Sequence, residues 1–367
     1  MLRFNALTGF RCLAACMVFV YHNRKYWRND LHRELNRFLN EFHLGVALFF
    51  VLSGFLIAHT YGDKPMQSAK TWFRYILQRM ARILPLYWLI LTLYYLDPAY
   101  GKGGYTWLTY SLFHGFSDVH NLDGIAQAWS LTVEMTFYFF APLLCLLQRK
   151  HLLYLIGFLL LLFGITWGAG AIWYNINSNA GKYFYPLQFV ITGTFPGHCT
   201  QFLAGMLLAD MLRNKKTQWL QNTPLKTWAG FLGIAATTYA IGLFQPDVFH
   251  HGNRELGGKM LQIFVLPVFV FFALAGLIYE RTWLQRFFAS RLLVLMGNAS
   301  FAFYLIHISY VNLKTKEWVQ LPDRNFILLW LISIALYLVF EKPVYDLCRK
   351  WLKPATVKNI PGREKTL

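Results

Sequence analysis

Residues 11–22 read Arg11-Cys-Leu-Ala-Ala-Cys-Met-Val-Phe-Val-Tyr-His22, an apolar run with a titratable side chain at each end. In an α-helix, eleven steps of about 100° return to nearly the same face, so Arg11 and His22 share a stripe about 16 Å apart along the axis. A charged side chain inside a membrane is costly when it faces lipid. We therefore expect both residues to face a bundle interior or a wet cavity. The alternative is that Arg11 snorkels to the nearer surface and His22 only marks the helix end.

The rest of the composition is typical of an integral membrane protein. The 367 residues are 56% hydrophobic and only 14% charged, whereas soluble domains carry about 25% charged residues. The net charge is +18, but Lys and Arg lie in short segments between apolar runs, which argues against nucleic-acid binding. The five cysteines form no CxxC pair and have no zinc-ligand spacing. We expect reduced, buried thiols and no metal cofactor.

Successive apolar runs predict an all-α, polytopic membrane bundle of about ten transmembrane helices. The runs lie near residues 5–22, 44–61, 83–96, 128–147, 152–173, 187–211, 227–244, 260–279, 291–312 and 326–345. If the N-terminus is cytoplasmic, the inside segments hold about twice as many Lys and Arg residues as the outside ones, so both termini are predicted to be cytoplasmic. Residues 1–345 form the predicted membrane domain, and residues 346–367 form a short basic cytoplasmic tail.

Residues 23–43 are basic although this topology places them outside. Apolar residues recur there at helical spacing, which predicts an amphipathic helix: Leu31, Leu35, Phe38, Leu39 and Phe42. Such a helix would lie in the membrane interface. The same pattern would also suit a lid over the end of the helix that carries His22, and both interpretations stay open.

Two further motifs carry polar groups in apolar surroundings. Ser53-Gly54 lies inside the second run, where it favours close helix packing and places one hydroxyl in the interior. Arg79 and Arg82 are neighbours on a helix at the predicted cytoplasmic entrance of the third span, where two guanidinium groups could bind phosphates. A plain positive-inside anchor is the alternative for this pair. Pro85, one turn later, is expected to bend or restart the helix.

The later runs add a carboxylate, a phenol and an imidazole. Glu134 and Tyr138 are i, i+4 partners on one face, and an intramembrane carboxylate indicates a functional site. We expect Arg11 or His22 to be the partner of Glu134; a structural buried ion pair is the alternative. Tyr304 and His307 share a helix face; a satisfied interior histidine is the alternative for His307. Four other histidines have no partner in sequence and are interpreted as structural: His59, His114, His120 and His198.

Taken in order, these pieces resemble the acyltransferase-3 family of integral membrane O-acyltransferases, over essentially the whole chain. The resemblance rests on six motifs, each weak alone: Arg11-x10-His22, Phe49-Phe-Val-Leu-Ser-Gly-Phe55, Arg79-x-x-Arg82-x-x-Pro85, Trp129-Ser-Leu-x-x-Glu134 with Phe137-Tyr138, Tyr304-Leu-Ile-His307 and Glu341-x-Pro343. The chain departs from the family at Cys12, where glycine usually follows the arginine. No SGNH-type esterase domain is present in the sequence, so we expect transfer to finish within the membrane domain.

The resemblance implies transfer of an acyl group, usually acetyl, from cytoplasmic acyl-CoA to a hydroxyl of an extracytoplasmic or lipid-linked glycan. It implies that His22 and Arg11 are essential and that Arg79 and Arg82 take part. The expected catalytic residues are His22, Arg11 and Glu134, with His22 as general base or transient acyl carrier. The expected donor-binding residues are Arg79, Arg82, Ser53, Tyr138 and His307. We expect a multi-pass protein of the bacterial inner (plasma) membrane that modifies polysaccharide.

Two alternatives remain at this stage. A transporter or flippase of a lipid-linked sugar would use Arg11, Glu134 and His22 as a substrate or proton path, although we find no repeated halves in the sequence. Within the enzyme hypothesis, the acceptor could be a small hydroxylated metabolite and the acyl group succinyl or longer.

Overall fold

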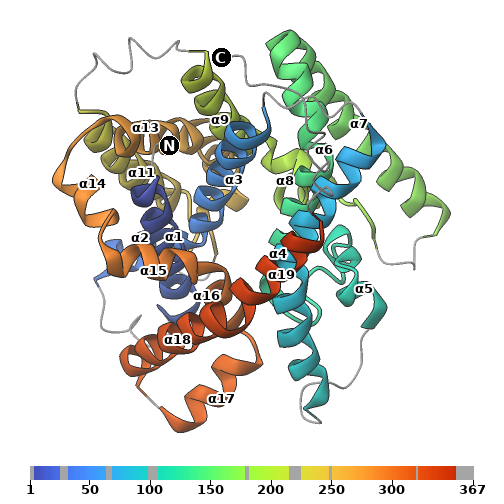
Figure 1. The fold of residues 1–367 in the computed structure, drawn as a ribbon. Coiled ribbons are helices and arrows are strands. Elements are labelled where there is room, and N and C mark those ends of the chain that lie inside the picture. The colour runs from blue at the N-terminus through green and yellow to red at the C-terminus, as the bar shows by residue number, and fades with distance from the viewer. Residues whose placement is uncertain are drawn as a thin grey trace, which may run out of the picture.

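The computed structural model describes residues 4–24, 32–62, 68–97, 106–177, 182–214, 225–247, 250–319 and 321–352, which are predominantly helical (Figure 1). The first half contains α1 (Asn5–Asn23), α2 (Arg33–Asn40), η2 (Glu41–Leu44), α3 (Gly45–Tyr61), α4 (Ala69–Leu96), α5 (Thr106–Tyr110), η3 (Phe113–Phe116), η4 (Ala126–Ala128), α6 (Trp129–Lys150) and α7 (Leu152–Ile176). The second half contains α8 (Leu187–Gly193), α9 (Phe195–Arg213), α11 (Lys226–Leu243), η5 (Gly252–Arg254), α12 (Leu256–Met260), η6 (Leu261–Val265), α13 (Leu266–Tyr279), α14 (Trp283–Phe288), α15 (Arg291–Asn298), α16 (Ser300–Ile306), α17 (Tyr310–Trp318), α18 (Pro322–Leu336), η7 (Tyr337–Glu341) and α19 (Lys342–Trp351).

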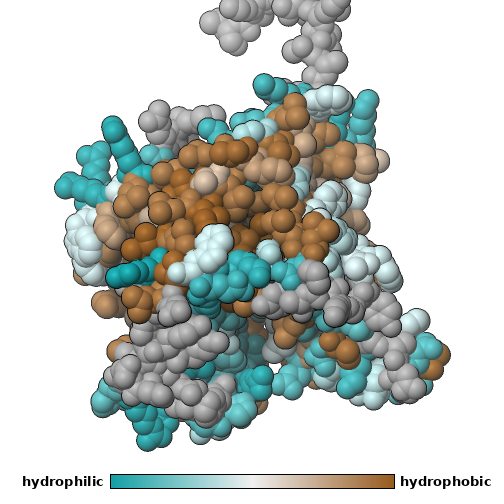
Figure 2. Space-filling view, turned by 90° about the horizontal axis from the view of Figure 1, so that it is seen from below, coloured by the Kyte–Doolittle hydropathy of each residue, from teal (hydrophilic) through white to brown (hydrophobic). Residues whose placement is uncertain are grey.

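The predicted apolar runs are helical, but fewer of them qualify as membrane spans. Six helical segments of the described chain are long and apolar enough to cross a membrane, or seven if one bent pair counts as a span. Helices α1 and α11 and the α8–α9 pair are not among them. Ten spans and cytoplasmic termini therefore stay predictions. Figure 2 shows a broad apolar area on the face seen from below, bordered by hydrophilic residues, as expected for a surface that faces lipid.

Two predicted runs are interrupted for local reasons. Within residues 187–211 the chain is extended at Thr194, and Pro196 occupies the first turn of α9, where a missing N–H costs nothing. Within residues 291–312 the segments Arg291–Ile306 and Tyr310–Trp318 meet at 91°. The Ser309 side chain accepts a hydrogen bond from the backbone N–H of Val311 and so caps the second segment.

Neither Pro85 nor Pro343 ends its helix. Helix α4 begins at Ala69 and continues through Pro85 to Leu96, so the prediction that Arg79 and Arg82 are neighbours on a helix is confirmed. Pro343 lies in the first turn of α19, which continues to Trp351. The π-helical turn η7 directly precedes this proline. A π turn shifts the hydrogen-bond register, which accommodates a residue without an N–H.

The centre of the bundle brings the polar motifs together. Helix α1 packs against α3, α13, α15 and α16, and α3 packs along α9. Glycines allow the last contact: a Cβ atom at Gly54 would lie 2.1 Å from the carbonyl oxygen of Phe202, and one at Gly205 would lie 1.9 Å from that of Val51. The predicted packing role of Ser53-Gly54 is confirmed for the glycine. Because Gly54 packs against α9, the side chain of Ser53 lies on another side of α3 and contacts Glu134 of α6.

The amphipathic helix predicted within residues 23–43 is present as α2, followed by η2 and then α3. Residues 25–31, including Leu31, lie outside the described residues. Helix α2 packs against α11, and the side-chain amide of Gln245 donates to the carbonyl oxygen of Arg37 at 2.9 Å. Its predicted role as an interface helix or lid stays open.

Candidate active site

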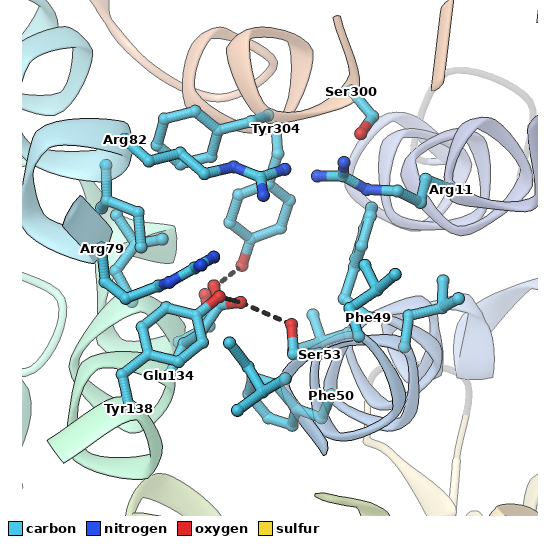
Figure 3. Close-up of a pocket in the computed structure, with 18 residues that line it drawn as sticks. Arg11, Phe49, Phe50, Ser53, Arg79, Arg82, Glu134, Tyr138, Ser300 and Tyr304 are labelled. Atoms are coloured by element: carbon cyan, nitrogen blue, oxygen red, sulfur yellow. Dashed lines mark hydrogen bonds between the residues drawn. The ribbon is translucent and has the colours of Figure 1, made fainter. Parts of the chain in front are cut away.

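A pocket lies where α1, α3, α4, α6 and α16 meet, and it contains most of the polar residues singled out in the sequence (Figure 3). Apolar side chains of α3, including Phe49 and Phe50, line part of its wall. Nine charged or hydroxyl-bearing residues line the rest: Arg11, Ser53, Arg79, Arg82, Ser130, Glu134, Tyr138, Ser300 and Tyr304. Five elements from distant parts of the sequence thus contribute to one cavity.

Three arginines give this pocket its charge. The guanidinium groups of Arg11 and Arg82 point toward one another across the cavity in Figure 3. Among the described residues, no carboxylate makes an ion pair with either group, and the nearby carboxylates of Glu341 and Glu134 act on Arg11 only from a greater distance. Two cations that share a cavity repel each other unless an anion lies between them. If Arg79 and Arg82 bind an anion as predicted, Arg11 is placed to take part.

Arg79 is held by three tyrosine rings. Its guanidinium carbon lies 5.2 Å from the ring centroid of Tyr61, 5.7 Å from that of Tyr75 and 5.9 Å from that of Tyr138. Its Nη2 also donates to the Tyr61 hydroxyl at 2.8 Å. Cation–π contacts favour the charged group without neutralising it. Arg79 is thereby oriented while its Nε, which is buried, has no hydrogen-bond partner among the described residues.

Glu134 is bound by two hydroxyl groups. Its Oε1 accepts a hydrogen bond from Ser53 at 2.5 Å and one from Tyr138 at 2.5 Å. The i, i+4 pairing with Tyr138 is confirmed. The structure does not pair Glu134 with Arg11 or His22: over the described ranges, neither residue makes an ion pair or hydrogen bond with this carboxylate. Glu134 thus places one negative charge among three arginines and fixes two hydroxyl groups at the pocket wall.

The part of the pocket wall that α16 forms is fixed by hydrogen bonds to Ser130 and Gln127. The Tyr304 and Ser130 hydroxyls are 2.7 Å apart, and the Gln127 amide donates to the carbonyl oxygens of Tyr304 at 2.9 Å and Leu305 at 2.8 Å. His307 follows directly after α16, and its Nδ1 lies 2.7 Å from the Tyr304 carbonyl oxygen. That contact assigns the ring proton to Nδ1 and leaves Nε2 as an acceptor, buried and without a described partner.

His22 does not line the pocket, although it lies on the same continuous helix as Arg11. The rings of His22 and His307 have centroids 5.2 Å apart, and those of His307 and Tyr304 are 5.5 Å apart. A contiguous row of rings therefore leads from the pocket to His22. His307 and Tyr304 thus separate His22 from the pocket that contains Arg11.

The remaining histidines that were interpreted as structural lie away from this pocket. His198 contacts the Thr192 carbonyl oxygen at 2.9 Å and the Gln201 amide oxygen at 3.2 Å. His120 pairs with Asp123 at 2.9 Å, and the His59 ring stacks on Phe55. Burial lowers the pKa of His114 to about 4, so this imidazole is neutral at physiological pH.

Sequence reasoning named Tyr138 but missed the other two tyrosines that surround Arg79, Tyr61 and Tyr75. Tyr75 precedes Arg79 by four residues in α4, a spacing that places the two on one face and could have been noticed. Tyr61 ends α3, and no spacing connects it to Arg79.

Comparison with known proteins assigns the chain to a family. The family model described as "Acyltransferase domain", Acyl_transf_3, matches residues 4–340. The chain belongs to the acyltransferase-3 family. All five elements around the pocket lie within the matched residues. The family resemblance noted from the sequence motifs is thereby confirmed.

The similar curated proteins are distant. A Staphylococcus aureus (strain COL) protein named "Putative O-acetyltransferase" is 22% identical over 391 residues, which cover 97% of this acyltransferase-3 chain. A counterpart of the same name in strain N315 matches equally. The chain spans 58% of the length of these relatives. "Protein 2 in picA locus" of Rhizobium radiobacter is 36% identical over 91 residues, covering 25% of this chain and 44% of that protein. No solved structure matches the chain.

Proposed function

We propose that this acyltransferase-3 protein moves an acyl group, acetyl by preference, from cytoplasmic acyl-CoA to a hydroxyl of an extracytoplasmic or lipid-linked glycan. The observation that carries the proposal is the pocket that joins Arg11, Arg79 and Arg82 to hydroxyl donors and an apolar wall. Guanidinium groups bind phosphates by charge-assisted hydrogen bonds. The apolar side chains of α3 suit the thioester arm and the acyl chain.

Within this proposal the donor enters from the side of Arg79 and Arg82. These two residues bind CoA phosphates, and Arg11 lies deeper, beside the pantetheine. The thioester extends beyond Arg11, along Tyr304 and His307, to reach His22. Ser53 and Tyr138 line the cavity that receives the donor, where Glu134 orients both hydroxyl groups. The carboxylate also limits the repulsion among the three arginines.

His22 serves as the general base in this scheme. It takes the proton of the acceptor hydroxyl as the alkoxide oxygen attacks the thioester carbonyl; the C–S bond then breaks, and CoA leaves as the thiolate and is reprotonated. His307 and Tyr304 lie between the pocket and His22 and orient the imidazole from that side. An acyl-histidine is the alternative route, in which His22 attacks the thioester first and passes the acyl group to the hydroxyl.

The experiment is acyl transfer by the full chain in detergent, with acetyl-CoA as donor and a glycan extract as acceptor. Thiol release reports on the donor, and mass spectrometry reports added acetyl groups on the glycan. We expect His22→Ala to lower transfer by about 10²–10⁴-fold, as general-base removal does, while acetyl-CoA still binds. His120→Ala is the matched control, since His120 pairs with Asp123 away from the pocket. Full transfer by His22→Ala would refute the base assignment, and glycan binding without CoA release would favour the transporter hypothesis.

A further inference from the structure

Near the end of α1 that carries His22, the structure gathers a second set of ligating side chains outside the pocket. Glu41 and His43 belong to η2, and His251 directly precedes η5. One ligand atom of each residue lies within 4.8 Å of the other two, and Glu41 Oε2 is 3.7 Å from His43 Nδ1. Ligand atoms about 2 Å from one tetrahedral metal ion are roughly 3.3 Å apart. The three ligand atoms therefore need to move only a short way toward one another to bind a single metal ion.

Two buried polar atoms of this cluster make no hydrogen bond of normal geometry with the described residues. Glu41 is fully buried; its Oε1 accepts from the Gly252 N–H at 2.7 Å and from the Gln245 amide at 2.6 Å. Its Oε2 has no hydrogen-bond partner among the described residues, and Nδ1 of His251 is likewise buried without a hydrogen bond of normal geometry. Buried polar atoms without partners are costly and rare, so two of them in one cluster require an explanation.

An ordinary ion pair does not supply that explanation. The buried ammonium group of Lys259 donates to Gln262 Oε1 at 2.9 Å, and no Lys or Arg among the residues that the structure describes lies within 4 Å of the Glu41 carboxylate. Among the described residues, the His43 imidazole is the basic group that lies within that distance, whereas Arg24 and Lys259 act on the carboxylate only from farther away. A buried carboxylate without a cation is unfavourable unless it is protonated or a cation binds to it.

Nε2 of each imidazole contacts a polar side chain, which is the arrangement that orients histidine ligands of metal ions. The Tyr21 hydroxyl lies 2.9 Å from His251 Nε2, which leaves Nδ1 of that ring toward the cluster. The side-chain amide of Asn253 lies 3.0 Å from His43 Nε2, and it can present either its oxygen or its nitrogen to that ring. Hydrogen bonds to the second ring nitrogen fix the tautomer and orientation of a histidine ligand.

We propose that Glu41, His43 and His251 bind a divalent transition-metal ion, Zn²⁺ by preference. Two imidazoles and one carboxylate form a ligand set that suits Zn²⁺, and three protein ligands leave a position for water or another oxygen ligand. The ion ties η2, at the head of α3, to the segment that begins at His251. Through Tyr21 it also steadies the end of α1 that carries His22. The site goes beyond the proposed acyl transfer and does not depend on it.

The test measures metal binding by the full chain in detergent, without any acyl donor or acceptor. The protein is stripped with a chelator and titrated with Zn²⁺, and Co²⁺ is used as a spectroscopic probe of tetrahedral coordination. We expect one ion per chain and visible Co²⁺ absorption bands. Removing an outer hydrogen-bond partner with Tyr21→Phe lowers Zn²⁺ affinity by about 10-fold or more, and removing a ligand with His251→Ala or Glu41→Gln lowers it further.

The variants are chosen so that a failure of folding is not mistaken for loss of the metal. Glu41→Gln keeps an Oε1 acceptor for the Gly252 N–H and the Gln245 amide, so it removes the charge with the least change in packing. His250→Ala is the matched control. His250 directly precedes the ligand His251, but its side chain is half-exposed and contacts Asp247. We expect this control to bind Zn²⁺ as the wild type does. Absence of stoichiometric Zn²⁺ or Co²⁺, or equal affinity in Glu41→Gln, would overturn the proposal.

Discussion

Glu134 and Glu280 are two carboxylates held by hydrogen bonds in different regions of the bundle. Glu280, directly after α13, accepts from the backbone N–H groups of Lys226 and Thr227 at 2.8 Å each and from the Thr227 hydroxyl at 2.5 Å. It also pairs with the Lys226 ammonium at 3.1 Å. Glu134 has two hydroxyl donors on one oxygen and, within the described part of the chain, no ion pair.

This difference separates a structural carboxylate from one that belongs to a site. Glu280 takes its donors and its counter-ion from the neighbouring segment of the fold, so it joins the start of α11 to the end of α13 and needs no ligand. Glu134 supplies one negative charge to a cavity with three arginines. The excess positive charge is what an anionic donor would neutralise. The number of hydrogen bonds to a carboxylate therefore says less about function than the charge left uncompensated around it.

The strongest test of this comparison substitutes both carboxylates by their amides. We expect Glu134→Gln to lower acyl transfer by about 10–100-fold, because charge-assisted hydrogen bonds contribute about 1.5–3 kcal/mol. Its thermal stability in detergent should stay close to that of the wild type. Glu280→Gln should show the reverse pattern: a lower Tm and wild-type transfer per folded molecule.

Each variant serves as the control of the other, since both remove one negative charge. Transfer rates and thermal denaturation are measured on the same preparations. If Glu134→Gln transfers normally while it unfolds at a lower temperature, Glu134 is structural and the distinction drawn here fails.

A second effect of similar size, confined to one kinetic constant, concerns the arginines. We expect Arg79→Ala combined with Arg82→Ala to raise the KM for acetyl-CoA by about 10–100-fold, because each guanidinium contributes charge-assisted bonds to phosphate. The KM for the acceptor should change far less. Arg74→Ala is the matched control, because Arg74 lies on the same helix but does not line the pocket. An unchanged donor KM would leave Arg79 and Arg82 as topology anchors.

Much of the pocket could be predicted because it follows from helical periodicity. The common helix of Arg11 and His22 and the bond from Tyr138 to Glu134 both come from spacing within one segment. The convergence of Arg11 with Arg79 could be anticipated only from the cost of a charge that faces lipid. Contacts between separate helices could not be predicted in this way. Examples are Ser53 with Glu134, 81 residues apart, and Tyr61 with Arg79.

The second cluster shows why the rest escaped prediction. Glu41 and His43 are two residues apart, but His251 is more than 200 residues away, and no metal-binding spacing connects them. Their proximity depends on how α2 and η2 pack against α11 and η5. Helix interruptions at Thr194 and after Ile306 were missed for a similar reason, since capping by Ser309 overrides the apolar pattern.

The smallest expected effect is the pH dependence of the Glu280 contact. Burial alone would raise the pKa of Glu280, but hydrogen bonds from Thr227 and Lys226 outweigh burial and lower it. A carboxylate with a lowered pKa contributes stability above its unfolded pKa of about 4.3, and that contribution is lost as the pH falls through the folded value. The Tm difference between the wild type and Glu280→Gln should therefore be constant from about pH 7 to 5 and shrink below about pH 4. Thermal denaturation in detergent across this range measures it, and a difference that grows on acidification would mean that the Glu280 carboxylate does not stabilise the α11–α13 contact in its ionised form.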